Sequence, residues 1–253
     1  PHCSYIYLPH LDYAAQKLGP DSDLALQAVS ELDAVIGDLA DSINASAEQP
    51  VTWIAVSEYV ITEVDHVTYP NRVLRDAGLL QVKELEDGEH LDLENSNAWA
   101  LVDHQFSHVF VKDSDQAVAE RVAGLFRGQE GFEQVLVGPE RAQLAMDHER
   151  SGEVILVSPA NSWQAYYWWL DDSKAPGFAP TVDIHRKPGY DPVELHFDMQ
   201  TMSTPLDATL IKGSHGAPVR DVTQRGTILC SDSSLLGDDG LRDVDIARIV
   251  VGS

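Results

Sequence analysis

Apolar residues recur at helical spacing in several parts of the chain. Between Ser22 and Asn44 they return every three or four positions, and acidic residues occupy the opposite face. This pattern predicts an amphipathic helix with Asp21 or Ser22 at its N-terminal cap. The apolar stripe of this helix consists of Ala25, Val29, Leu32, Ile36, Leu39 and Ile43. Related patterns predict further helices at residues 70–78, 114–126 and 139–146.

Short apolar runs alternate with these helices and predict strands. They lie at residues 5–8, 51–57, 79–82, 99–102, 108–111, 153–157 and 227–230. The run 51–57 is apolar almost throughout, which is typical of a strand buried on both faces. Alternating helices and buried strands predict an α/β fold with a largely parallel sheet flanked by helices. We expect one unit over residues 1–253, with a smaller inserted sub-region at about 95–192 that ends in a long loop from residue 171.

The charge narrows the possible partners. The chain has 41 acidic and 17 basic residues and a formal net charge of −24. Such a surface repels a phosphate backbone, so we do not expect a nucleic-acid duplex as a partner. No apolar run has the length of a membrane span. The two cysteines, Cys3 and Cys230, are too few for a disulfide framework, so we expect buried thiols and favour a cytoplasmic location.

Three loops carry residues suited to chemistry. In a parallel sheet, ligands gather beyond the carboxyl ends of the strands. Asp12 follows the first predicted strand, Glu58 and Tyr59 follow the run 51–57, and His215 stands between two glycines. Each also has a plain structural interpretation, as a turn cap, exposed surface residues or a core histidine. Because these loops share one sheet edge, we expect Asp12, Glu58 and His215 to converge.

The three loops resemble, in order and spacing, motifs of the type I phosphodiesterase/nucleotide pyrophosphatase family in the alkaline phosphatase superfamily. Asp12 followed by Gly19-Pro20 resembles the family's Asp-x-x-x-His loop and Gly-Pro turn. Residues 57–59, Ser-Glu-Tyr, resemble its Ser-Asp-His, and residues 213–216 resemble its late Gly-Ser-His-Gly loop. Each motif alone is weakly specific, but the three in order are more so.

The resemblance implies an alkaline-phosphatase-like fold and a metal-dependent hydrolase. The bond cleaved would be a phosphodiester or a pyrophosphate in a small phosphorylated substrate, with nucleotide-linked compounds among the candidates. Two divalent metal ions would clamp the phosphoryl group. A serine or threonine nucleophile is also implied. We expect it upstream of Pro1, in an N-terminal portion of the same protein, so the catalytic residue is unknown from this chain.

The chain departs from the family at several expected metal ligands. Gln16 and Tyr59 stand where the family has histidines, and Glu58 stands where it has aspartate. Fewer nitrogen donors favour Mg²⁺ or Mn²⁺ over Zn²⁺. The resemblance therefore implies a metal site at Asp12, Gln16, Glu58 and His215, with Tyr59 contacting the substrate.

Two further clusters can supplement this site. His104 and His108 can share an ion if the chain turns between them, and His185 is another nitrogen donor, which keeps Zn²⁺ as an alternative. An ordinary hairpin with two satisfied histidines is the competing interpretation. Arg186 and Lys187 form a cationic pair in a chain with few cations, so we expect them to grip phosphate. A surface ion-pair loop is the alternative.

The sequence is also compatible with two other functions. The altered ligands also suit a catalytically degraded protein that binds a phosphoryl group or a partner on the same fold. A hydrolase of phosphonate or sulfate esters is a third hypothesis. The aromatic run 163–169 favours core packing over stacking on a base or sugar.

Overall fold

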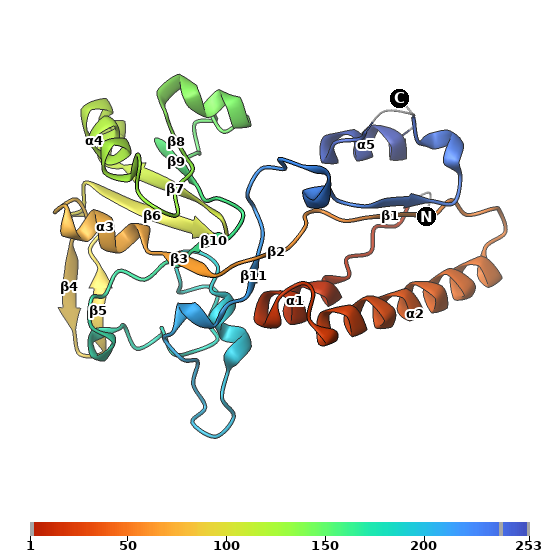
Figure 1. The fold of residues 1–253 in the computed structure, drawn as a ribbon, viewed down its shortest axis with the longest axis horizontal. Helices are drawn as coiled ribbons and strands as arrows, with labels where there is room; N and C mark the ends of the chain where they lie inside the picture. The colour runs from red at the N-terminus through yellow and green to blue at the C-terminus, as the bar shows by residue number, and fades with distance from the viewer. Residues whose placement is uncertain (1–2, 238–239, 252–253) are drawn as a thin grey trace.

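The computed structural model describes residues 3–237 and 240–251 (Figure 1). Its helices are α1 (Asp12–Leu18), α2 (Asp23–Ser46), α3 (Pro70–Asp76), α4 (Gln116–Phe126) and α5 (Asp243–Val251). Figure 1 shows α3, α4 and most strands on one side, and α1, α2, β1 and α5 on the other. None of the helices in the described residues is both long enough and apolar enough to cross a membrane.

The strands form one larger sheet and several pairs. The larger sheet has four strands in the order β6-β7-β9-β8, all antiparallel. Its strands are β6 (Ala98–Asp103), β7 (Phe106–Val111), β8 (Gln134–Val137) and β9 (Val154–Val157). The paired strands are β1 (Ile54–Val56) with β12 (Ile228–Cys230), β2 (Thr62–Glu63) with β11 (Gly213–Ser214), β3 (His66–Thr68) with β10 (Ser162–Gln164), and β4 (Val82–Leu85) with β5 (Gly88–Leu91).

The chain is an α/β protein, but the prediction of a largely parallel sheet is wrong. Within residues 3–237 and 240–251, β3 and β10 form the parallel pair, and the other ladders are antiparallel. The physical reason lies in the connections. Hairpins join β4 to β5 and β6 to β7 directly, and a tight turn permits antiparallel pairing alone. The inserted sub-region at about 95–192 stays a prediction.

The helices agree with the sequence-based predictions better than the strands do. The Ser22 hydroxyl caps α2 by accepting a hydrogen bond from the Ala25 N–H, as predicted. Residues 5–8 form no strand, and the run 51–57 contributes only the three partly exposed residues of β1. The helix predicted at residues 139–146 is a 3-10 segment, Gly138–Leu144. Cys3 is exposed and Cys230 is half-buried, so neither is the buried thiol that we expected.

The centre of the core is the aromatic segment 163–169, which begins on β10 and continues beyond it. Its large side chains are at most 1% exposed, which confirms core packing for this run; they are Trp163, Tyr166, Tyr167, Trp168 and Trp169. Residues 165–169 are not part of a strand, so their buried carbonyls need other hydrogen-bond partners. Helix α3 supplies the donors: Asn71 donates to the Tyr166 carbonyl, Arg75 to that of Trp168 and Arg72 to that of Trp169.

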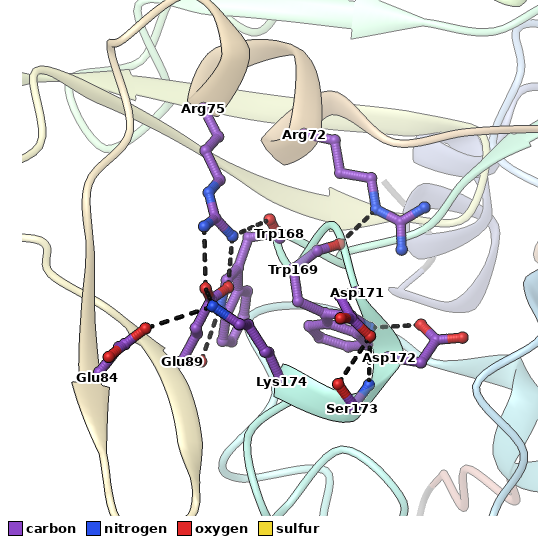
Figure 2. Close-up of polar contacts among 10 residues, drawn as sticks. All are labelled: Arg72, Arg75, Glu84, Glu89, Trp168, Trp169, Asp171, Asp172, Ser173 and Lys174. Carbon is purple, nitrogen blue, oxygen red and sulfur yellow. Dashed lines mark hydrogen bonds and ion pairs between the residues drawn. The ribbon is translucent and has the colours of Figure 1, made fainter.

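An ion-pair network around Glu89 holds α3 and the aromatic segment together (Figure 2). Arg75 donates to both carboxylate oxygens of Glu89, at 2.5 and 3.1 Å. The Glu89 carbonyl in turn accepts the indole N–H of Trp168 at 2.9 Å. Lys174 lies 3.7 Å from Glu89 and 3.4 Å from the exposed Glu84. Glu89 therefore joins α3, β5 and the aromatic segment at one point.

Helix α2 is covered much less than the core. Of its 24 residues, Ala25 and Ala28 are buried, whereas Leu26 and Val29 are more than half exposed. Strands β1 and β12 pair only with each other within the described residues. On the stripe predicted from the sequence, Ala25 is buried, Val29 is exposed, and the remaining members, Leu32, Ile36, Leu39 and Ile43, are half-buried.

The two glutamates that share Lys174 give a matched stability test. Replacing Glu89 by Ala should lower the free energy of unfolding by about 3 kcal/mol, because Arg75 loses its buried partner. Replacing Glu84 by Ala should cost at most about 1 kcal/mol, since an exposed pair contributes little. Urea unfolding followed by circular dichroism measures both. Equal losses would show that Glu89 does not have this anchoring role.

Candidate functional site

Three of the predicted site residues meet at one place. The Tyr59 hydroxyl donates a hydrogen bond to the Asp12 carboxylate over 2.7 Å. The Tyr59 ring also lies flat on the His215 imidazole, with ring centroids 3.6 Å apart and an angle of 3° between the planes. Asp12 begins α1, Tyr59 follows β1, and His215 follows β11. Glu58, next to Tyr59, is exposed.

Close packing of β11 on α1 brings these loops together. The Lys212 N–H donates to the Gln16 carbonyl at 2.9 Å, just before β11 begins. Gly213 has no side chain, and a Cβ atom there would overlap the Ala15 carbonyl oxygen. Glycine thus allows the strand to approach the helix backbone closely. The buried Gln16, expected as a ligand, helps to hold α1 through this backbone contact.

Two more rings extend the stack. The His104 ring lies against His215, with ring centroids 3.9 Å apart and the planes tilted by 34°, and Tyr190 stacks on His104 at 5.2 Å. His104 begins the two-residue turn between β6 and β7 and has a φ of 54°. A side chain at positive φ is strained, and such strain concentrates at functional sites. The site therefore contains a column of four rings: Tyr59, His215, His104 and Tyr190.

Burial keeps the imidazoles neutral. It lowers the pKa of His215 to about 4, and together with His215 it lowers the pKa of His104 to about 3. The Nδ1 atom of His104 is buried and has no hydrogen-bond partner in the described residues. Burial raises the pKa of Asp12, and the Tyr59 hydroxyl opposes that rise. At neutral pH both imidazoles can therefore accept a hydrogen bond or bind a cation.

A cavity of about 290 Å³ lies beside Tyr59. Its polar lining includes Glu58, Tyr59, Thr62, Gln105, Gln224 and Asp243. The charged groups among its lining residues are the two carboxylates, Glu58 and Asp243. An anionic phosphoryl group would be repelled here unless a cation offset those charges.

The described residues do not fit the pair of metal ions that the resemblance implies. Among them, no three histidine, cysteine, aspartate or glutamate side chains lie close enough together to hold an ion. Tyr59 is one reason, because its hydroxyl occupies an Asp12 oxygen where the family pattern has a metal-binding imidazole. Asp12 and His215 are therefore near each other, but they do not form a closed metal site.

The other expected donors lie elsewhere. His108 is on β7 between Phe106 and Phe110, and its Nδ1 accepts the Gly152 N–H at 3.2 Å. The turn does fall between His104 and His108, as a shared ion requires, but the two histidines have different neighbours. His185 is exposed on the loop that precedes Tyr190. The structure thus brings one of the three supplementary histidines, His104, to the site.

Lys187 is buried, so the expected exposed pair with Arg186 does not exist. The Lys187 side chain is 0% exposed and contacts Asp191 at 2.8 Å and Glu194 at 2.6 Å. Burial raises the pKa of Asp191, and the Lys187 ammonium opposes the rise. Arg186 is exposed and lies 5.3 Å from the centre of the Phe178 ring. Lys187 therefore balances internal carboxylates and cannot grip a surface phosphate in this conformation.

Sequence reasoning missed two residues of this site. Tyr190 ends the ring column, and Gln105 lines the cavity and bonds to the His215 loop. A signal for Tyr190 existed in the preceding glycine: Gly189 has a φ of 129°, and a Cβ atom there would overlap the Val102 carbonyl oxygen. That close approach lays the Tyr190 segment along β6.

The fold and the site define an α/β protein in which a carboxylate, a tyrosine and two neutral imidazoles converge from separate loops beside a cavity. Residues 1–191 match the family model described as type I phosphodiesterase / nucleotide pyrophosphatase. The chain belongs to this family, which confirms the resemblance seen in its motifs. His215 lies beyond the matched residues.

Among solved structures, the chain is similar to phosphonoacetate hydrolase from Sinorhizobium meliloti 1021, at 15% identity and a TM-score of 0.42. That match covers 62% of this chain and 37% of the hydrolase. It is also similar to murine ectonucleotide pyrophosphatase / phosphodiesterase 5, at 16% identity and a TM-score of 0.44, covering 81% of this chain and 44% of the murine protein. The chain thus spans less than half of each. A search of curated proteins gives no match.

Lys187 and its exposed neighbour Arg186 allow a matched test of the buried ion pairs of Lys187. Replacing Lys187 by Met should lower the free energy of unfolding by about 3–5 kcal/mol, because it leaves two carboxylates without their buried partner. Replacing the exposed Arg186 by Met should cost less than about 1 kcal/mol. Thermal and urea unfolding of both variants make the comparison. A Lys187 variant as stable as the parent would contradict the buried ion pairs.

Proposed function

We propose that this chain is part of a phosphoester hydrolase that cleaves a phosphodiester or pyrophosphate bond. The observation that carries the proposal is the convergence of Asp12, at the start of α1, with Tyr59 and His215 from two loops, in the order of the family's motifs. Family membership supports the same chemistry. The substrate would be a small phosphorylated molecule, with nucleotide-linked compounds among the candidates.

A divalent metal ion is part of this proposal. The cavity beside Tyr59 contributes carboxylates, so a phosphoryl group needs positive charge from another source. Mg²⁺ or Mn²⁺ suits the oxygen donors Asp12 and Glu58, and Zn²⁺ is the alternative because His104 and His215 offer nitrogen. Since three donors do not converge within the described residues, an ion needs additional ligands or a movement of Tyr59.

The nucleophile is the other component that the proposal requires. The resemblance implies a serine or threonine hydroxyl in an N-terminal portion of the same protein. The poorly covered apolar residues of α2, together with the exposed Tyr5 and Tyr7, support contact with further polypeptide on this side of the molecule. Asp12, Glu58 and His215 would then form one half of a site completed by that portion.

A second candidate function follows from the Tyr59–Asp12 hydrogen bond. In a metal site the carboxylate would bind the ion, whereas here a hydroxyl satisfies one of its oxygens. The alternative is therefore a catalytically degraded protein that binds a phosphoryl group or a partner. Activity and metal content distinguish the two functions.

Hydrolysis of bis-p-nitrophenyl phosphate by the chain joined to its N-terminal portion tests the proposed enzyme. We expect activity to be lost in EDTA and best restored by Mn²⁺ or Mg²⁺. Replacing Asp12 or His215 by Ala should lower kcat at least about 100-fold, because each removes a central donor. The surface variants Asp38→Ala and His148→Ala are matched controls. Equal hydrolysis in the chelator would end the metal hypothesis, and no hydrolysis under any condition would favour the binding protein.

Metal affinity itself gives an independent test of the two unusual positions. Replacing Tyr59 by Phe frees the Asp12 oxygen, and replacing Gln16 by His adds a nitrogen donor. We expect the first to strengthen Mn²⁺ binding, and the second to strengthen Zn²⁺ binding by about tenfold or more. Competition with a chromogenic chelator measures both affinities. If Tyr59→Phe binds Mn²⁺ no better than the parent, the hydroxyl does not compete with an ion at Asp12.

A further inference from the structure

Gln105 holds the loop that carries His215 at two points. Its backbone N–H donates to the His215 carbonyl at 2.9 Å, and its side-chain oxygen accepts the Ala217 N–H at 3.0 Å. These bonds lie on either side of Gly216, whose φ is 106°. Gln105 itself is 1% exposed. Gln105, a buried residue from another part of the chain, therefore binds the backbone on both sides of Gly216.

The orientation of the Gln105 amide is also fixed. Its nitrogen lies 2.8 Å from the Ala160 carbonyl oxygen and 3.2 Å from both the Ser162 carbonyl oxygen and the Thr62 hydroxyl. The two carbonyl oxygens require a donor, so the amide nitrogen faces them and the amide oxygen faces the Ala217 N–H. A carboxylate of the same shape would oppose two carbonyl oxygens, so glutamate cannot replace glutamine here without repulsion.

The turn that contains Gln105 is anchored through its backbone as well. The Gln105 carbonyl accepts the Ser158 N–H at 2.8 Å, and the His104 carbonyl accepts the Gln164 N–H at 2.7 Å. His104 keeps its positive φ of 54° within this turn. Hydrogen bonds from β10 and from the end of β9 thus compensate for a strained conformation that places His104 against His215.

We propose that Gln105 is a positioning residue that holds the His215 imidazole between Tyr59 and His104. Its effect on catalysis rests on the proposed function, whereas its effect on the position of His215 does not. Because Gln105 acts through the His215 loop, its loss should displace the imidazole while the aromatic core stays folded. A group displaced by about 1 Å can cost about 100-fold in rate.

The test compares three variants of the chain. Gln105→Glu replaces the donating amide nitrogen by an accepting carboxylate oxygen, and Gln105→Met removes the side-chain hydrogen bonds without adding charge. Asn71→Asp is the matched control, because Asn71 is also a fully buried amide that donates to two carbonyls and accepts one N–H, and its partners are Ala100 and Tyr166. The side-chain ¹H–¹⁵N signals of His215, assigned with His215→Gln, report the imidazole position, and thermal unfolding reports stability.

We expect all three variants to unfold at lower temperature, and the His215 signals to move in the two Gln105 variants but not in Asn71→Asp. In the enzyme joined to its N-terminal portion, kcat should fall about 100-fold for Gln105→Met. If Gln105→Glu does not fold, Gln105→Met alone decides. His215 signals that match the parent in Gln105→Met, or that move equally in Asn71→Asp, would overturn the positioning role. An inactive parent enzyme would reject the proposed function, and the His215 signals would still decide the positioning.

Discussion

The structure depends on the need to satisfy buried backbone carbonyls in a segment that belongs to no strand. Residues 166–169 carry four of the largest aromatic side chains of the core, yet within the described residues no strand pairs with them. Helix α3 offers Asn71, Arg72 and Arg75 as donors instead, and Asn71 also pairs with Ala100 on β6. An unpaired buried carbonyl is costly, so these hydrogen bonds hold α3 against the aromatic segment. Asn71 in addition ties α3 to β6.

The site is built by a similar use of polar contacts between loops. Gly213 lets β11 approach α1, and the turn at residues 104–105 binds the loop that follows β11. The result is a stack of neutral rings next to a carboxylate, in a place where the family pattern implies metal ligands. The electrostatics of this centre therefore differ from those of a metal pair. An anion bound at this centre therefore needs a cation beside it to offset the repulsion from the carboxylates.

The sequence was a good guide where local forces decide and a poor one where distant contacts decide. Helix α2 and its Ser22 cap follow from spacing and capping within a few residues. Strand direction depends on which distant segment pairs with which, so the antiparallel ladders were not evident. Lys187 looked like a surface cation because its neighbours are polar, yet Asp191 and Glu194 draw it inside. Asp12 and His215 were expected to converge at the edge of a parallel sheet. They do lie close together, but they do so through Tyr59 and the packing of β11 on α1.

The exposed apolar side chains of α2, among them Leu24, Leu26 and Val29, affect the tendency of the protein to self-associate. Uncovered leucines and valines favour self-association, and the net charge of −24 opposes it by mutual repulsion between molecules. Salt screens that repulsion over about 8–10 Å at ordinary ionic strength, and acidification toward the isoelectric point near 4.5 removes it. The acidic surface thus acts as a dispersant for this polypeptide, and its solubility is set by solvent composition as much as by its fold.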